Sequence, residues 1–482
     1  MRVSQFFNLQ RTQPTLDFVD VDVANDLKAF IDPWAIRHVE SEWTEQCVSL
    51  VQNYFQALLD CAQRNDEAKA ISILKPLREP NETHLGLSKG RSKGRALGPY
   101  LVKEVWGRLK ISRAVATGLL EDIEDTMLLI DKIGPDIISD ITSNIIRGPL
   151  IKYTQDMCDA VGIPLTTNLD SGPVWSAVKH QWESGYVDLP TANGKKILLV
   201  PKIVVRHRLE YDVGEYYNGY IIEHLQAAEL AAGSELVRLI KSKKRKGSEK
   251  KVYKKDVKKK YGGGKGVILD QTIKHPDVLA EYRRDKQGKT FDSLTHDEVA
   301  ATLGQPVPDW DVLLGNVLNT PTGKADATKY EKTIEELLNA LFHPWLIYPI
   351  SQHPIHGGLK RIDLTYSNTG RGVFFGWLAA NYTCPKIMIE CKNYGDDVGN
   401  PELDQLSSRF SPNRGRVGML ICRSFQDKAR FLKKCRSTAD DDRGFVITLD
   451  DNDLKVLVAQ AKVGQAQGDF PLLRSQFDAL IM

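Results

Sequence analysis

The sequence predicts a mainly α-helical N-terminal part with a small β hairpin region, followed by a C-terminal α/β domain with a mixed central sheet flanked by helices. Three observations lead to this prediction. Residues 1–240 repeat apolar side chains at helical spacing, residues 324–482 alternate helix-like and strand-like segments, and a Lys/Gly-rich stretch at 241–266 separates the two patterns.

Helical periodicity dominates the N-terminal part, where Val48, Val51 and Phe55 recur near a period of 3.6 residues. The dipeptide Asn193-Gly194 separates two apolar runs and predicts a hairpin among the β elements near 184–208. The segments with the helical pattern are 42–63, 114–131, 136–163 and 215–240.

A strongly basic segment follows the N-terminal part. Residues 241–260 contain twelve Lys/Arg and two Asp/Glu, a net charge of +10 in a chain whose total is +3. Lysine runs followed by three consecutive glycines rarely pack, so we expect an exposed loop or hinge at 241–266 and a helical connector at 267–323.

The C-terminal domain begins with an amphipathic helix at 328–342. The stretch 368–385 is expected to hold an inserted strand or short helix, which leaves the strand order open. The expected strands are 346–350, 360–366, 386–392, 416–422 and 444–449, with further helices at 401–410 and 425–436.

Composition excludes several classes of protein. Hydrophobic residues make up 42% and charged residues 26%, which argues against disorder over most of the chain. No apolar run approaches the roughly 20 residues of a membrane span, and no signal-peptide pattern is present, so we expect a cytoplasmic protein without a membrane partner. The seven cysteines are never spaced as CxxC, which argues against a disulfide framework or a thiolate zinc site.

The residues that point to chemistry lie between 331 and 410. Glu390 and Lys392 are two residues apart on a predicted strand and therefore share a face, whereas Cys391 points to the opposite side. If the strand of Asp363 pairs nearby, two carboxylates and an ammonium group converge. Carboxylate oxygens are ligands for Mg²⁺, which assists phosphodiester hydrolysis. We therefore expect Asp363 and Glu390 to bind Mg²⁺, with Mn²⁺ able to substitute.

Two further residues are candidates for supporting roles. Glu335 on the preceding helix is expected to reach the metal directly or through water, with Glu331 and Glu336 as rivals. Gln405 is expected to project towards the site from the following helix. The alternative for both is an ordinary solvent-facing side chain.

This order of residues resembles the PD-(D/E)XK, or restriction-endonuclease-like, nuclease superfamily over about residues 325–455. The resemblance rests on Glu335, Asp363, the Glu390-Cys391-Lys392 triplet and Gln405, and Ile362 stands where the family often has proline. It implies a restriction-endonuclease-like fold and a Mg²⁺-dependent deoxyribonuclease that serves bacterial restriction or anti-phage defence. It also makes a homodimer or partner proteins of a defence system conceivable.

Basic residues outside this domain are candidates for DNA binding. A glycine-interrupted loop at 88–95 and the lysine block would contact phosphates, and the alternative for each is a solvated loop. The candidates are Arg91, Lys93, Arg95, Lys243, Lys244, Arg245, Lys246, Lys250, Lys251, Lys254 and Lys255.

Two other functions compete with DNA cleavage. One is a catalytically inactive nucleic-acid-binding or regulatory scaffold, which would be expected to lack an acid or the lysine, and none is missing. The other is an RNA-directed nuclease, because both backbones are hydrolysed by the same metal chemistry.

Overall fold

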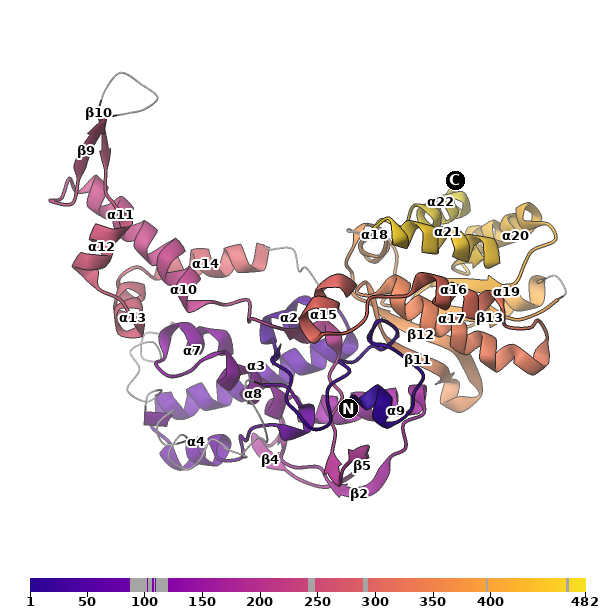
Figure 1. Ribbon diagram of the computed structural model, residues 1–482, viewed down its shortest axis with the longest axis horizontal. Helices are drawn as coiled ribbons and strands as arrows, with labels where there is room; N and C mark the ends of the chain where they lie inside the picture. Colours follow the sequence, from indigo (N-terminus) through magenta and orange to yellow (C-terminus); the bar gives the residue numbers. More distant parts are fainter. Residues whose placement is uncertain are drawn as a thin grey trace.

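The computed structural model describes residues 1–86, 120–241, 248–288, 294–395, 398–464 and 468–482, together with four isolated positions between 102 and 109. The chain forms two units, each with its own hydrophobic core (Figure 1). The first core takes side chains from Val3 to Leu303 and also Ile347, and the second begins with Leu313. The units therefore meet near 304–312, so most of the predicted connector packs into the N-terminal unit.

The N-terminal unit is mainly helical, as predicted. The longest helix among its described residues, α3 (Glu42–Arg64), begins at Ser41, whose hydroxyl accepts a hydrogen bond from the backbone N–H of Thr44. The other helices are α1 (Val3–Phe6), α2 (Pro33–His38), α4 (Glu67–Leu74), α7 (Ile123–Leu129), α8 (Pro135–Ile145), α9 (Arg147–Val161), α10 (Val213–Glu215), α11 (Ile222–Ala231), α12 (Lys254–Tyr261), α13 (Lys265–Lys274), α14 (Pro276–Gly288) and α15 (His296–Leu303), with the π-helical turn η4 (Tyr216–Ile221) and the 3₁₀ turns η1 (Gln13–Thr15), η2 (Asn81–Thr83) and η3 (Lys202–Val204).

Short strand pairs complete this unit. The predicted hairpin at Asn193-Gly194 forms between β6 (Thr191–Ala192) and β7 (Lys195–Lys196), and the apolar residues that follow it leave the strand. The remaining pairs are β1 (Phe30–Ile31) with β8 (Val205–Arg206), β2 (Thr166–Asp170) with β5 (Tyr186–Leu189), and β3 (Val174–Ser176) with β4 (Gln181–Glu183).

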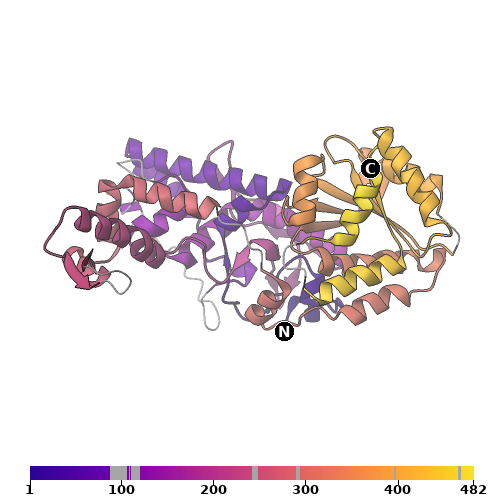
Figure 2. The same ribbon diagram turned by 90° about the horizontal axis from the view of Figure 1, so that it is seen from above.

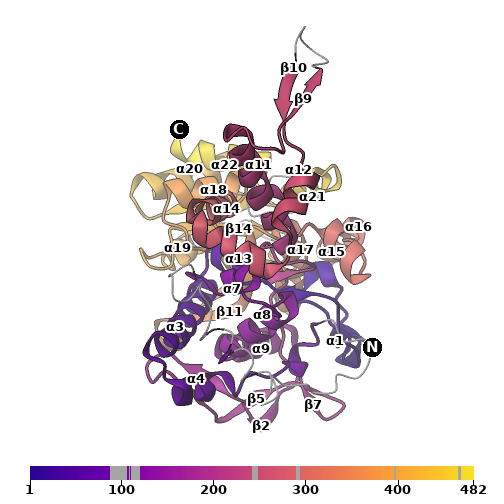
Figure 3. The same ribbon diagram turned by 90° about the vertical axis from the view of Figure 1, so that its left-hand side faces the viewer.

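The basic segment differs from the loop predicted at 241–266. Strands β9 (Arg238–Lys241) and β10 (Ser248–Lys251) pair antiparallel, and α12 follows them. The helix forms because Val257 is buried and Glu229 of α11 accepts hydrogen bonds from Lys260 and Tyr261. Figures 1 and 3 show the β9–β10 ribbon projecting away from the rest of the molecule.

The C-terminal unit is an α/β domain around a five-stranded mixed sheet, as predicted. The strand order is β11-β12-β13-β14-β15, in which the first two pairings are antiparallel and the last two are parallel. The strands are β11 (Leu346–Ile355), β12 (Lys360–Asn368), β13 (Lys386–Lys392), β14 (Val417–Cys422) and β15 (Phe445–Leu449).

Helices cover both faces of this sheet (Figure 2). The insertion at 368–385 contains a short helix, α18 (Val373–Asn381), which is one of the two expected forms. Helices α19 (Asn400–Ser407) and α20 (Lys428–Asp440) pack on one face through Leu403, Leu406 and Phe431. The opposite core contains side chains of α16 (Trp310–Leu318), α17 (Ala327–Phe342), α18, α21 (Asp451–Lys462) and α22 (Pro471–Ile481), while the turns η5 (Lys324–Asp326) and η6 (His356–Gly358) precede α17 and β12.

Polar contacts that are buried or partly buried join the two units. Arg11 of the N-terminal unit reaches Glu335 of α17, and the Tyr348 hydroxyl donates a hydrogen bond of 2.7 Å to Asp156 of α9. Within the described part of the chain, no helix is both long and apolar enough to cross a bilayer.

Candidate active site

The ends of two neighbouring strands bring the predicted acidic residues together. In the antiparallel β12–β13 ladder Leu364 pairs with Ile389, so Asp363 and Glu390 are the next residues along the two strands. The backbone N–H of Cys391 donates a hydrogen bond of 2.8 Å to Oδ2 of Asp363. The strands therefore place the two carboxylates opposite each other on one face of the sheet.

Lys392 and Gln405 complete this cluster. Nζ of Lys392 lies 2.8 Å from Oε1 of Glu390 and 3.3 Å from Oε1 of Gln405. The amide of Gln405 also donates a hydrogen bond to Glu390, so α19 is tied to the strand end. Cys391 packs in the core on the opposite side of the sheet, as the alternation of strand side chains predicts. All four predicted residues of the strands and α19 thus lie together.

Burial and mutual repulsion set the charge of the acids. Glu390 is completely buried. Its pKa is raised to about 7, mainly by burial and to a smaller extent by the nearby charge of Asp363. Burial likewise raises the pKa of Asp363, against the opposing hydrogen bond from Cys391. The carboxylates raise the pKa of Lys392 despite its partial burial, so its ammonium group stays protonated at neutral pH. Two acids directly opposite each other on one sheet face cost stability unless a cation joins them.

The acidic residue of α17 closest to this cluster is Glu331, a rival in the prediction, and not the favoured Glu335. The charge of Asp363 contributes to the raised pKa of Glu331, and Gln352 of β11 donates a 2.9 Å hydrogen bond to its Oε2. Glu335 instead pairs with Arg11 at 3.0 and 3.1 Å. Helix geometry explains the separation of Glu331 from Glu335, because four residues move a side chain about one turn, roughly 5–6 Å, along the axis.

Two residues near the acids were not expected from the sequence. Gln352 contributes a hydrogen bond to Asp363, and the positive charge of Arg409 lowers the pKa of both Asp363 and Glu390. Arg409 follows α19 four residues after Gln405, so helical spacing from the predicted glutamine was the available signal. Gln352 lies in an irregular part of β11 that the strand pattern did not reveal.

The cluster has several properties of a site for a hard cation. No group of three His, Cys, Asp or Glu side chains among the described residues is arranged to hold a metal. Two carboxylates are nevertheless compatible with Mg²⁺, which usually keeps several waters and binds substrate phosphates. Oε2 of Glu390 is buried without a hydrogen-bond partner, and a buried unpaired oxygen is costly. Asp363 and Glu390 thus fit a divalent cation.

The raised pKa of Glu390 predicts a pH-dependent stability in the absence of metal. Between its ordinary pKa of 4.5 and the raised value of about 7, the folded protein keeps a proton that the unfolded chain releases. Stability contributed by this group therefore falls as pH rises through that window. When pH is raised from about 5 to about 8, the free energy of unfolding of Glu390→Gln should increase by about 1–3 kcal/mol relative to that of wild type. Urea unfolding in the presence of EDTA measures this difference. An equal difference at both pH values would contradict the burial of an ionisable Glu390.

The predicted nucleic-acid-binding residues fall into two groups. Lys250 and Lys251 lie on β10, and Lys254 and Lys255 begin α12, all with exposed side chains. The other candidates lie outside the described residues, namely Arg91, Lys93, Arg95, Lys243, Lys244, Arg245 and Lys246.

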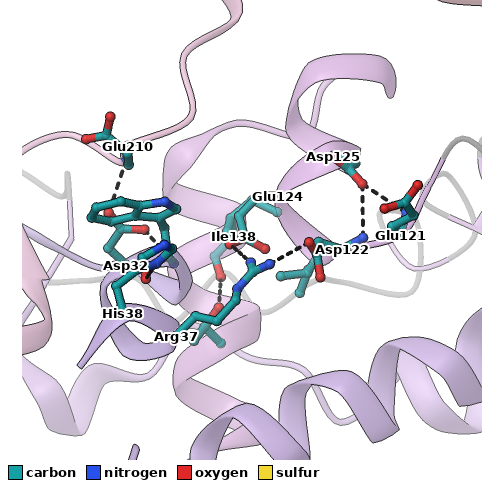
Figure 4. A network of polar contacts seen from close by, with 12 residues as sticks. Asp32, Arg37, His38, Glu121, Asp122, Glu124, Asp125, Ile138 and Glu210 are labelled. Atoms are coloured by element: carbon teal, nitrogen blue, oxygen red, sulfur yellow. Dashed lines mark hydrogen bonds and ion pairs between the residues drawn. The ribbon is translucent and has the colours of Figure 1, made fainter. Parts of the chain in front are cut away.

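A second polar cluster lies in the N-terminal unit and was not expected from the sequence. Figure 4 shows Arg37 of α2 directed between Asp122 and Glu124 at the start of α7. Burial raises the pKa of Glu124 to about 7, and the charge of Arg37 opposes this. These residues border a cavity of about 480 Å³ between α2, α3 and the start of α7. The ion pairs of Arg37 join α2 to the start of α7 within the unit.

Comparisons with known proteins give one family model for the N-terminal unit and one partial relative. The family model described as "Domain of unknown function (DUF8370)" matches residues 8–212. The chain is similar to a "Putative transposon gamma-delta 80.3 kDa protein" of Escherichia coli (strain K12), with 27% identity over 113 residues that cover 23% of this chain and 16% of that protein. No solved structure matches the chain.

Proposed function

We propose that the C-terminal unit is a Mg²⁺-dependent nuclease with a restriction-endonuclease-like fold that hydrolyses phosphodiester bonds of DNA. The observation that carries this proposal is the meeting of Asp363, Glu390 and Lys392 on one sheet face at the ends of two adjacent strands. Gln405 from α19 reaches the same point, which supports a functional cluster over an isolated surface ion pair.

Asp363 and Glu390 would hold the cation in this proposal. A bound Mg²⁺ lowers the pKa of a coordinated water and stabilises the negative charge that develops on the phosphate. Lys392 stays protonated because both carboxylates raise its pKa. It therefore acts as a positive charge that orients water and stabilises phosphate oxygens, and the alternative role as a base for the water is disfavoured.

Gln405 acts as a positioning residue. Its amide contacts both Glu390 and Lys392, so it sets the direction of the carboxylate and of the ammonium group at once. Glu331 on α17 lies beside the cluster and accepts a hydrogen bond from Gln352. It would bind a water molecule that is coordinated to the cation. Arg409 adds a positive charge beside the acids and would contact substrate phosphate.

The biological setting we propose is restriction or anti-phage defence in bacteria. The partial similarity to a putative transposon protein is compatible with a role around mobile DNA, although it covers only 23% of the chain. An inactive scaffold is the second candidate, and the intact set of two acids and a lysine disfavours it. RNA is the alternative substrate because the metal chemistry is the same.

Metal-dependent cleavage tests the proposal directly. Full-length protein should degrade plasmid DNA with Mg²⁺ or Mn²⁺ and lose this activity in EDTA. Lys392→Met should slow cleavage at least about a hundredfold, since it removes the positive charge that faces the phosphate. Lys455→Met is a matched control, because Lys455 is exposed on α21 and contacts Asn452. Equal cleavage by both variants, or none by wild type with any divalent cation, would contradict the proposal.

A further inference from the structure

A basic arm, which we define as β9, β10 and α12, lies at the edge of the N-terminal unit. Its ribbon is a separate two-stranded sheet that extends beyond the body of the molecule (Figures 1 and 3). An isolated two-stranded ribbon is only marginally stable in water. Contacts with a partner would therefore stabilise this ribbon.

The charge of the arm identifies the chemistry of that partner. Its described residues include nine Lys/Arg and two Asp/Glu, a net charge of +7. Three of the cations are neutralised within the unit, because Arg238, Lys254 and Lys260 pair with Asp256, Glu223 and Glu229. No carboxylate partner is present among the described residues for Lys250, Lys251, Lys255, Lys258 or Lys259. The complementary partner is a polyanion.

Cations also converge at the base of the ribbon. Arg238, Lys251 and Lys255 lie 5.7, 5.5 and 5.9 Å from the centroid of the Tyr253 ring. The ring attracts each cation, and Asp256 neutralises Arg238, but the like charges of Lys251 and Lys255 repel each other. A phosphate at this position would relieve that repulsion, so the base of the ribbon is suited to the backbone of a nucleic acid.

The shape of the arm distinguishes among nucleic acids. The major groove of B-form DNA is about 12 Å wide and admits a two-stranded β ribbon, whereas that of A-form RNA is deep and narrow. On one ribbon face Lys250 pairs with Leu239, whose side chain is 69% exposed. An exposed apolar residue beside a lysine is suited to a groove, where base edges and thymine methyl groups lie between phosphates.

We propose that the basic arm binds double-stranded DNA, with the β9–β10 ribbon in the major groove and α12 on the adjacent phosphates. This inference rests on the proposed nuclease function for its biological meaning, and it adds the form of the substrate. It assigns duplex DNA as the ligand and disfavours RNA and single strands.

Binding measured without cleavage tests the arm independently of the nuclease. Full-length protein in EDTA is titrated against short fluorescent duplex DNA. The ribbon variant Arg238→Gln/Lys250→Gln/Lys251→Gln should bind at least about tenfold more weakly, with a salt dependence flatter by roughly two to three units of slope. Lys455→Met, at an exposed position of α21, should bind as wild type does. If wild type binds duplex DNA but does not cleave it with any divalent cation, the nuclease proposal fails while the inference about the arm stands.

A matched control separates the arm from net charge. Lys75→Gln/Lys179→Gln/Lys195→Gln removes the same charge from exposed positions on the body of the N-terminal unit and should stay within about twofold of wild type. Circular dichroism and melting curves confirm that both variants fold. Equal weakening by the two triple variants, or unchanged binding by the ribbon variant, would overturn the proposal.

Competitors test the groove and the duplex. Wild type should prefer duplex DNA to single-stranded DNA and double-stranded RNA by at least about tenfold, and the ribbon variant should lose this preference. Bulky glucosyl groups on cytosine in the major groove should weaken binding, whereas netropsin in the minor groove should not. Preference for RNA or for a single strand, or displacement by netropsin alone, would contradict a ribbon in the major groove.

Discussion

Replacing Asp363 by Asn is expected to lower cleavage by at least about a thousandfold while leaving the fold intact. Asparagine keeps an oxygen that accepts the 2.8 Å hydrogen bond from Cys391, so the strand end is preserved. It removes one of the two negative charges that would hold the cation. The measurement is the single-turnover rate of DNA cleavage at saturating Mg²⁺.

The same substitution should also leave stability unchanged or increase it. The charge of Asp363 helps to raise the pKa of Glu390, so removing that charge relieves repulsion in the metal-free protein. Asp440→Asn, at the exposed end of α20, is the matched control and should cleave normally. Cleavage by Asp363→Asn within tenfold of wild type would remove Asp363 from the site.

Replacing Arg11 by Met is expected to destabilise the protein by about 3–5 kcal/mol, because it leaves a buried carboxylate without its cation. Arg11 donates to both oxygens of Glu335 and lies 3.4 Å from Glu336, and its side chain is 1% exposed. Asn339, at 3.3 Å from Glu335, cannot replace that charge. Urea and thermal unfolding of the full chain measure the loss.

The partner substitution tests the cause of that loss. Arg11→Met/Glu335→Leu removes both charges and should recover most of the stability lost in the single variant. The exposed ion pair between Lys462 and Asp311 provides a control, and Lys462→Met should cost less than about 1 kcal/mol. If Arg11→Met lost no more stability than Lys462→Met, the buried ion pair between Arg11 and Glu335 would not stabilise the fold.

The alternation of strands and helices in the C-terminal domain was predictable because buried strands carry a dense local signal. The five expected strands all form, and the period of two within Glu390-Cys391-Lys392 placed the acid and the lysine on one face. The convergence of Asp363 with Glu390 needed only that two strands pair, and the ladder supplies that pairing. Local pattern was sufficient for this part of the candidate site.

Long-range contacts were not predictable in the same way. Helical periodicity does not distinguish Glu331 from Glu335, since both lie on α17 and the choice depends on Arg11, more than 300 residues away in sequence. The arm was missed because Lys runs and glycines indicate a solvated loop, whereas the buried Val257 and the contacts to Glu229 order α12. In each case a distant partner decided the structure.

We propose that Asp363 and Glu390 jointly hold one divalent cation. Crystals of the protein soaked with Mn²⁺ and measured at the manganese absorption edge test this most directly. We expect one anomalous peak between the two carboxylates at about 2.0–2.3 Å from an oxygen of each, and no such peak in Asp363→Asn crystals. The absence of a peak between the two carboxylates, or manganese bound only elsewhere on the protein, would contradict this cation site.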